Sequence, residues 1–256
     1  MHDQHVHSNY SPDSKTKMEE YIKNSKDQLF TFTDHYDLTD PWNDYTDQVY
    51  SFKDQRREMD ELEAKYNVEI LQGIEIGYSK RSKERILKVL NENDFDIVLL
   101  SVHHNDETDY MENFSGISEL DVVNGYFDKI LEALNEVDDA DVLTHLDFGL
   151  RVRKVSFDHI KSFEKKIEQI LSKVIEKGMS LEINAKGIGR YNTLEMYRYF
   201  LKLYSCLGGK DIVVNSDAHT IDVYKSNFSM IKDFLISLGI HQLNYYKKRK
   251  KYSISI

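Results

Sequence analysis

The sequence predicts a single α/β domain whose parallel strands close into a barrel of the TIM type. About seven short apolar runs alternate with longer amphipathic segments, which is the pattern of strand–helix units in a parallel sheet. The 256 residues suit one large domain, and a closed barrel fits this length better than an open sheet with spare domains. The two prolines leave no room for a proline-rich linker, so the predicted domain spans residues 1–256.

Strands are predicted where short runs are rich in apolar, β-branched and aromatic residues. The run 97–102 is almost continuously apolar, as expected for a strand that is buried on both faces. In chain order, the predicted strands span residues 4–7, 29–33, 68–76, 97–102, 142–144, 181–184 and 212–215.

Helices are predicted where apolar residues recur at helical spacing among charged ones. The stretch 105–116 is polar and acidic, and we expect a long loop there. In chain order, the predicted helices span residues 18–25, 47–66, 82–91, 120–135, 159–176, 193–207 and 223–238.

The composition is that of an ordinary globular protein, with 40% hydrophobic and 30% charged residues. No apolar run approaches the roughly 18 to 20 residues that cross a bilayer, and the N-terminus lacks the basic-then-apolar pattern of a secretory signal. The one cysteine, Cys206, excludes an internal disulfide and agrees with a reducing compartment. We therefore expect a cytoplasmic protein without a membrane partner.

The formal net charge of -10 argues against a general nucleic-acid binder, because such a protein needs a basic face to neutralise phosphates. The one basic run, residues 247–251, is typical of a solvated tail. Nucleic acid is therefore not the expected partner, and the sequence leaves the oligomeric state open.

The histidines gather at the predicted strand ends, and this distribution is the main functional signal. His5 and His7 are two residues apart on the first strand, so their side chains point to the same face. Other histidines follow the second, fourth, fifth and seventh strands, and acidic residues lie at matching places. These residues are His35, His103, His104, His145 and His219, with Asp13, Glu75 and Asp217.

In a parallel barrel all strands end on one face, so we expect these side chains to meet there. A lone histidine at a strand end is more often a hydrogen-bonded loop residue, but five strand ends that carry histidine are hard to credit as coincidence. Imidazole with carboxylate suits zinc, iron or manganese rather than calcium or magnesium. Without cysteine pairs a zinc finger is excluded, so the pattern predicts a catalytic metal centre.

Short motifs along the chain resemble those of the polymerase and histidinol phosphatase (PHP) family, in the family's order and over nearly the whole chain. They are His5-Val6-His7-Ser8, Thr33-Asp34-His35, Gly73-Ile74-Glu75, Ser101-Val102-His103, Thr144-His145 and Asn215-Ser216-Asp217-Ala218-His219. The Ser-Pro-Asp-Ser that contains Asp13, together with Arg151 and Arg190 after the fifth and sixth strands, resembles the histidinol-phosphate phosphatase branch.

The resemblance implies a distorted (β/α)7 barrel that holds three divalent metal ions, and it implies which residues bind each ion. Among the assigned ligands, Asp13 follows the family pattern least closely. It lies in the loop after the His5-Val6-His7 motif, whose length differs among branches, and some members place a histidine there. The first ion would be bound by His5, His7, Glu75 and Asp217, the second by Glu75, His103 and His145, and the third by Asp13, His35 and His219.

Such a centre suits hydrolysis of a phosphomonoester, because clustered metals lower the pKa of bound water and neutralise phosphoryl oxygens. By the resemblance, a hydroxide between the first two ions attacks phosphorus. Arg151 and Arg190 would bind the remaining phosphate oxygens with forked guanidinium donors, although Arg153 competes with Arg151 for this role. The catalytic residues would be Glu75, Asp217 and His219, and His104 is a candidate substrate or proton-transfer contact.

The branch resemblance favours L-histidinol phosphate as the substrate, and we expect a carboxylate of the acidic loop 105–112 to attract its amine. The nearest alternative is another phosphoesterase on the same scaffold. It would be a phosphotyrosine phosphatase, or an enzyme that acts on nucleotides as a phosphoesterase or exonuclease. The net negative charge argues against the nuclease. Two alternatives are not enzymes: a relative that uses the metals structurally or senses a ligand, and a binding module for a polymerase partner. The full set of predicted ligands weighs against the first of these.

Overall fold

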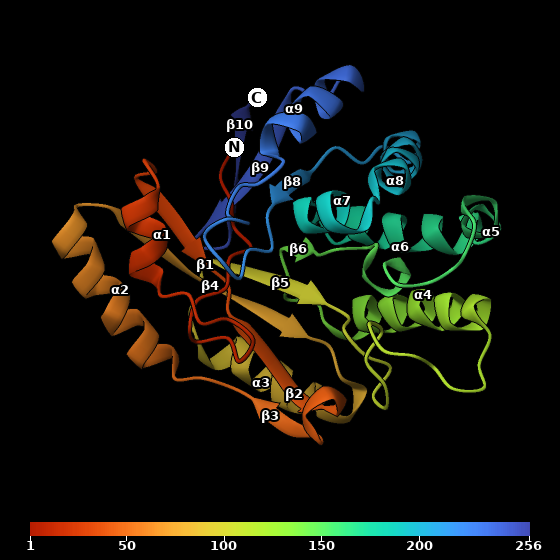
Figure 1. Cartoon of the computed structure of the whole chain (residues 1–256), viewed down its shortest axis with the longest axis horizontal. Coiled ribbons are helices and arrows are strands. Elements are labelled where there is room, and N and C mark those ends of the chain that lie inside the picture. The colour runs from red at the N-terminus through yellow and green to blue at the C-terminus, as the bar shows by residue number, and fades with distance from the viewer.

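The computed structural model describes residues 1–256 and shows helices arranged around a mainly parallel sheet (Figure 1). The strands of this sheet lie in the order β3-β2-β4-β5-β6-β7-β8, and β1 also pairs with β4. Their bounds are β1 (Leu29–Phe32), β2 (His35–Asp40), β3 (Thr46–Gln48), β4 (Glu69–Gly77), β5 (Ile97–Ser101), β6 (Val142–Leu143), β7 (Ser180–Asn184) and β8 (Ile212–Asn215).

The N-terminal segment closes this sheet into a barrel, although it is not the continuous strand that the sequence predicted. Val6 forms an isolated parallel bridge with Ala218, just after β8. Its carbonyl also accepts a hydrogen bond from the amide of Thr33, just after β1. Residues 5–7 therefore lie between the first and last parallel strands. The α/β barrel that the sequence predicted is confirmed.

Strands β1 and β2 are two parts of one interrupted barrel strand, because both run parallel to β4. Residues 29–32 pair with residues 69–72, and residues 35–37 pair with residues 75–77. The chain then turns back through β3, which pairs antiparallel with β2. The prediction that a helix begins at residue 47 is wrong, because this hairpin occupies residues 46–48 and the helix begins at Phe52.

Nine helices accompany the strands, and none of them combines the length and the apolar character that a membrane-spanning helix needs. The predicted helix 159–176 is divided into α5 and α6, the predicted start at residue 223 is five residues early, and α7 was not predicted. The helices are α1 (Met18–Asn24), α2 (Phe52–Tyr66), α3 (Lys83–Glu92), α4 (Glu119–Glu136), α5 (Phe157–Lys161), α6 (Glu164–Glu176), α7 (Ala185–Tyr191), α8 (Leu194–Cys206) and α9 (Phe228–Ser237).

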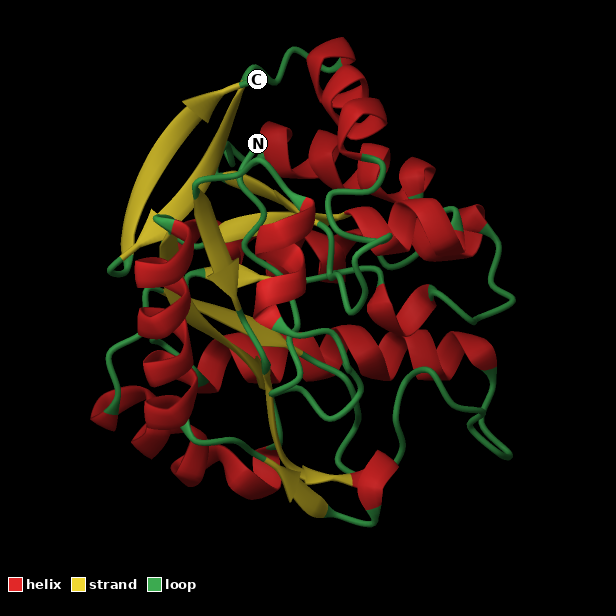
Figure 2. Cartoon of the chain, turned by 60° about the vertical axis from the view of Figure 1, so that its left-hand side comes forward, coloured by secondary structure: helices red, strands yellow, loops and turns green.

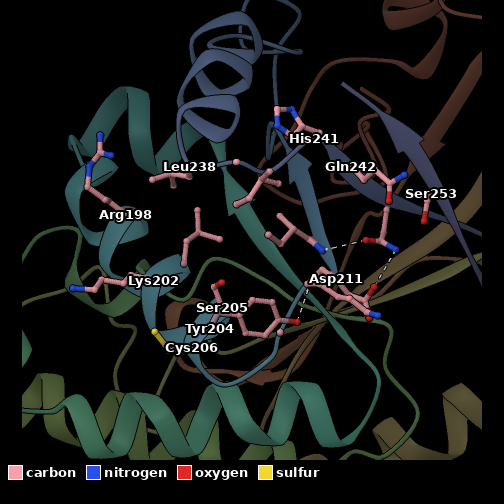
Figure 3. Close-up of a pocket in the computed structure, with 17 residues that line it drawn as sticks. Arg198, Lys202, Tyr204, Ser205, Cys206, Asp211, Leu238, His241, Gln242 and Ser253 are labelled. Atoms are coloured by element: carbon pink, nitrogen blue, oxygen red, sulfur yellow. Dashed lines mark hydrogen bonds between the residues drawn. The ribbon is translucent and has the colours of Figure 1, made fainter.

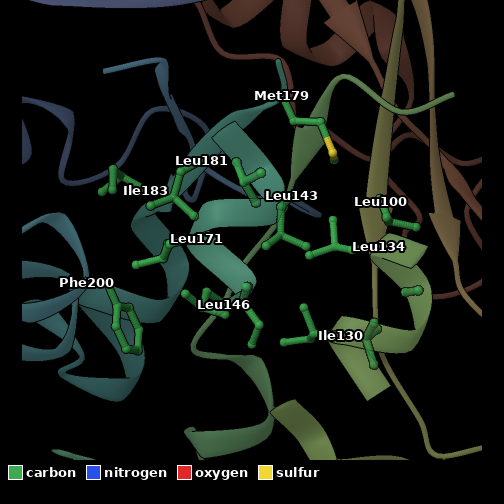
Figure 4. Packing of buried hydrophobic residues seen from close by; sticks show 14 of the residues in the cluster. Leu100, Ile130, Leu134, Leu143, Leu146, Leu171, Met179, Leu181, Ile183 and Phe200 are labelled. Carbon is green, nitrogen blue, oxygen red and sulfur yellow. The ribbon is translucent and has the colours of Figure 1, made fainter. Parts of the chain in front are cut away.

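The main core lies between the sheet and the helices that cover it. Leu100, Leu143 and Leu181 point outward from β5, β6 and β7 and belong to one buried cluster with residues of α4 and α6 such as Leu134 and Leu171 (Figure 4). Because side chains alternate along a strand, the intervening residues face the interior of the barrel. That interior contains a small apolar cluster of Ile97, Leu99, Val142, Val213 and Tyr246.

The C-terminal residues form an antiparallel hairpin of β9 (Gln242–Lys247) and β10 (Lys250–Ser255), which Figure 2 shows beside the main sheet. The prediction of a solvated basic tail is therefore wrong. Arg249, in the turn, binds Asp141 at 2.6 Å, and Lys251 binds Asp211 at 2.8 Å. Both acids immediately precede barrel strands, so the hairpin covers the end of the barrel at which the strands begin, and acids distant in the sequence pair with part of its basic run.

Candidate metal centre

Glu75 lies fully buried at the opposite end, the mouth, where the strands end. Its Oε2 lies 2.9 Å from Nδ1 of His35, 3.2 Å from Nε2 of His5 and 3.4 Å from Nε2 of His7. Three histidines from the N-terminal segment and the start of β2 therefore converge on one oxygen.

The other carboxylate oxygen of Glu75 has its own histidine partners. Oε1 lies 3.0 Å from Nε2 of His145 and 3.4 Å from Nε2 of His103. These two rings follow β6 and β5. Each oxygen of the carboxylate therefore faces a different set of imidazole nitrogens.

Asp13, Asp217 and His219 extend this group outward. Nε2 of His219 lies 2.8 Å from Oδ2 of Asp13, and its Nδ1 lies 3.5 Å from Oδ1 of Asp217. Asp217 also lies 3.6 Å from Nε2 of His7, and Asp13 lies 3.7 Å from Nε2 of His35. The structure thus brings all the predicted metal ligands to one place.

Several buried atoms at this place lie close to one another but form no well-aligned hydrogen bond, which is costly unless a ligand binds them. Overlapping triplets of side chains also offer ligand atoms within 4.8 Å of one another, so the residues fit a centre with more than one ion. The unpartnered atoms are Nε2 of His5, Nε2 of His7, Nδ1 of His35 and Oε2 of Glu75. The triplets are His5–His7–Glu75, His5–His145–Asp217, His35–Glu75–His103 and His7–His35–His219.

Three of these imidazoles are oriented through their second nitrogen, which is how proteins usually fix metal-binding histidines. Nδ1 of His5 lies 2.8 Å from Oε1 of Glu182, and Nδ1 of His103 lies 3.2 Å from Oδ1 of Asp37. Nδ1 of His7 contacts the hydroxyl of Ser11 at 3.0 Å. Each contact turns Nε2 toward Glu75.

Glu182 and Asp37 were missed in the sequence. Glu182 had a detectable signal, since it is a lone carboxylate within an apolar strand, as is Glu75. Asp37 had no such signal in the sequence, because its role depends on its carboxylate lying directly against the backbone of Gly77. A Cβ atom at that position would lie 1.5 Å from Oδ1 of Asp37, so only glycine leaves room for the carboxylate beside His103.

The charge of Glu75 raises the pKa of some of the surrounding imidazoles. Burial alone would lower the pKa of His35, but the nearby carboxylates of Glu75 and Asp13 raise it to about 9. Burial likewise opposes protonation of His5, but Glu75 and Glu182 hold its pKa well above the ordinary value. In the absence of ions, protons on these rings therefore compensate the buried carboxylate.

The predicted phosphate-binding arginines both line the cavity above this centre. Arg151 is buried and fixed, because Nε donates to Asp147 at 3.0 Å and Nη2 donates to Asn184 at 3.0 Å. Arg190 is exposed and has no acidic partner. Arg153 lies outside the cavity and donates to backbone carbonyls of the 105–116 loop. The geometry therefore favours Arg151 over Arg153.

The structure places His104 away from the cavity and brings Lys186 into its lining. His104 is buried outside the cavity, its Nδ1 accepts the amide of Asp106 at 3.0 Å, and burial lowers its pKa to about 4. The structure therefore does not bring His104 to the site. Lys186, which the sequence did not single out, lines the cavity with Nζ 3.0 Å from Oδ1 of Asp217 and 3.4 Å from Nδ1 of His219.

The cavity over the centre has a volume of about 430 Å³. A larger one, of about 1010 Å³, lies at the other end of the molecule between α8, α9 and the C-terminal hairpin (Figure 3). Its ionisable residues include Lys202, Asp211 and His241, and they form no metal-binding group. The smaller cavity is therefore the candidate site, because it alone contains the clustered ligands.

Comparison with known proteins agrees with this geometry. The PHP domain family matches residues 3–186 of the chain. A probable histidinol-phosphatase of Clostridium acetobutylicum is 25% identical over 257 residues, which cover 98% of this chain and 99% of the relative. The histidinol-phosphatase of Lactococcus lactis is also 25% identical, over 94% of this chain and 92% of the relative.

A solved structure has the same fold. It is the crystal structure of histidinol phosphate phosphatase from Lactococcus lactis, complexed with zinc, L-histidinol and phosphate. The two structures superpose with a TM-score of 0.86 over 98% of each chain, at 22% sequence identity.

Proposed function

Because this chain belongs to the PHP domain family, we propose that it is a metal-dependent phosphomonoesterase that hydrolyses L-histidinol phosphate to L-histidinol and phosphate. The observation that carries this proposal is the buried Glu75, with unpartnered imidazole nitrogens directed at its oxygens. The names of the full-length relatives support this substrate, and so does the bound product pair in the structure from Lactococcus lactis. The reaction would be a step of histidine biosynthesis.

The nine clustered residues would hold up to three divalent ions of zinc, iron or manganese. When bound, such ions supply a hydroxide nucleophile near neutral pH and neutralise the phosphoryl oxygens. Glu75 would be shared between two positions, since its two oxygens face different histidines. Asp217 and His219 would complete the catalytic set at the outer edge, where Asp13 also lies.

The remaining residues bind and orient the phosphoryl group. Arg151 is held in place by Asp147 and Asn184, so its side chain loses little conformational entropy when it binds an anion. Arg190 has a free guanidinium that offers forked donors to phosphate oxygens. Lys186 adds a third positive charge at the same side of the cavity.

The test is phosphate release by protein reconstituted separately with zinc, manganese or iron. L-histidinol phosphate would be compared with p-nitrophenyl phosphate, a phosphotyrosine peptide and a nucleoside monophosphate, with the Glu75→Gln variant as background. We expect the highest kcat/KM for L-histidinol phosphate. A higher kcat/KM for the peptide or the nucleotide would assign the chain to another phosphoesterase activity, and no release above background would remove the enzymatic proposal.

A further inference from the structure

The cavity over the metal centre is divided by charge. The segments that follow β6 and β7 supply all the lysine and arginine side chains of its lining, namely Arg151, Lys186 and Arg190, and no acidic residue. The β2–β3 hairpin and the loop after β5 supply its other part, which is acidic and partly apolar. This part consists of Asp37, Asp40, Trp42, Gln48, Asp109 and Met111.

Two of these acids have no cationic partner. Asp40 accepts a hydrogen bond from the amide of Trp42 at 3.0 Å, and Asp109 accepts one from the amide of Met111 at 2.6 Å. Partial burial raises the pKa of both carboxyls, that of Asp109 to about 6. At neutral pH the cavity therefore contains two carboxylates that form no ion pair with a lysine or arginine of the protein.

Two other acids of the 105–112 loop, Asp106 and Glu107, are paired elsewhere. Asp106 binds Lys129 and the hydroxyl of Ser79, and Glu107 lies on the surface 3.7 Å from Arg81. Of the acids in this loop, Asp109 is the one that lines the cavity.

Trp42 lines the same cavity as these carboxylates, and 66% of its surface is exposed. It is the one tryptophan of the chain, and it sits on a short helical turn at the tip of the β2–β3 hairpin. A flat indole next to two carboxylates can stack on a planar ring and attract a cation through its face.

We propose that Asp40, Trp42 and Asp109 form the pocket for the leaving group and select phosphomonoesters whose alcohol carries a cationic amine and a planar ring. This inference rests on the proposed function and deepens it. The phosphate dianion is directed to Arg151 and Arg190, and the ammonium to the acidic side. The cavity thus matches a substrate with opposite charges at its two ends, and it disfavours esters whose leaving group is neutral or anionic.

The first experiment compares matched esters with and without the amine. The pairs are L-histidinol phosphate with its deamino analogue, and 2-aminoethyl phosphate with ethyl phosphate. In Asp40→Asn and Asp109→Asn we expect the ratio of kcat/KM for the amino ester to that for the deamino ester to fall about tenfold, as for loss of a charged hydrogen bond. Glu107→Gln, a charge-matched change in the same loop, should leave the ratio unchanged.

Metal content is measured in each variant, so that a lost ion is not mistaken for lost selectivity. If both Asn variants retain the wild-type ratio, or if wild-type protein shows no preference for either amino ester, the proposed leaving-group pocket is wrong. The proposed phosphatase function is unaffected by that result. If L-histidinol phosphate is a poor substrate but Asp109→Asn abolishes a preference for 2-aminoethyl phosphate, the pocket stands and the proposed substrate is wrong.

The second experiment uses Trp42 as the only indole reporter. In metal-loaded protein, we expect L-histidinol to change the tryptophan emission saturably and inorganic phosphate to leave it unchanged. Replacement by Phe should raise KM for L-histidinol phosphate less than replacement by Ala, because Phe keeps a ring for stacking. Emission that is indifferent to L-histidinol at inhibitory concentrations, or equal KM values for the Phe and Ala variants, would exclude Trp42 from the pocket.

Discussion

His5 and Glu182 are joined by a 2.8 Å hydrogen bond between Nδ1 of the imidazole and Oε1 of the carboxylate. The bond leaves Nε2 of His5 facing Glu75 at 3.2 Å. The second oxygen of Glu182 accepts the backbone amide of His145 at 2.9 Å. One buried carboxylate therefore positions two of the proposed metal ligands.

Replacing Glu182 with Gln should weaken metal binding about tenfold, because the amide cannot raise the basicity of His5 as a carboxylate does. The measurement is chelator competition with zinc and manganese. Glu92→Gln, at an exposed position on α3, is the matched control. Unchanged affinity in a folded Glu182→Gln protein would show that His5 needs no orienting charge.

Glu75→Gln should lose at least one metal ion and most of the activity, because a neutral amide cannot bridge two cations through both of its polar atoms. Elemental analysis of the purified variant gives the metal content, and phosphate release gives the activity. Full metal content in a folded variant would contradict the proposed bridging role.

Arg190→Ala should raise KM and lower kcat/KM by about tenfold or more, since a charged hydrogen bond to phosphate is removed. Arg198→Ala is the control, because Arg198 is exposed on α8 and lines the distant cavity. An unchanged kcat/KM for Arg190→Ala would remove Arg190 from the phosphate site.

Metal affinity should rise with pH up to about 9. A bound ion needs a neutral imidazole nitrogen, but the carboxylates around His35 raise its pKa to about 9, so an ion must displace a proton below that pH. Calorimetric titration with zinc at several pH values, in buffers of different ionisation enthalpy, measures both affinity and released protons. A pH-independent affinity would show that the histidines are already neutral.

The same shift predicts how the stability of the metal-free protein depends on pH. The pKa of His35 is higher in the folded chain than its ordinary value of 6.5, so protonation stabilises the fold. This contribution is complete below about pH 6.5 and is lost as pH rises toward 9. Denaturant unfolding with and without ions should show that the stabilisation by metal grows over this interval.

The barrel and the metal ligands were predictable because an apolar run marks each strand and an ionisable residue lies at the end of most of these runs. Runs such as 97–102 mark a buried strand, and the histidines at five of the seven strand ends mark the mouth. What the sequence did not show depends on contacts between distant residues. Asp37 reaches His103 only because position 77 is glycine, and Arg249 is neutralised by Asp141, 108 residues earlier. A basic run in isolation gives no sign of such partners.

The C-terminal hairpin also affects when the centre can form. The side chain of Gln4, next to His5, donates to the carbonyl of Tyr246 at 2.7 Å and accepts its amide at 2.6 Å, across 242 residues. At about 5 to 20 residues per second, translation separates these partners by on the order of ten to fifty seconds. The first histidines thus leave the ribosome long before the segment that anchors them, and metal loading becomes a post-translational event.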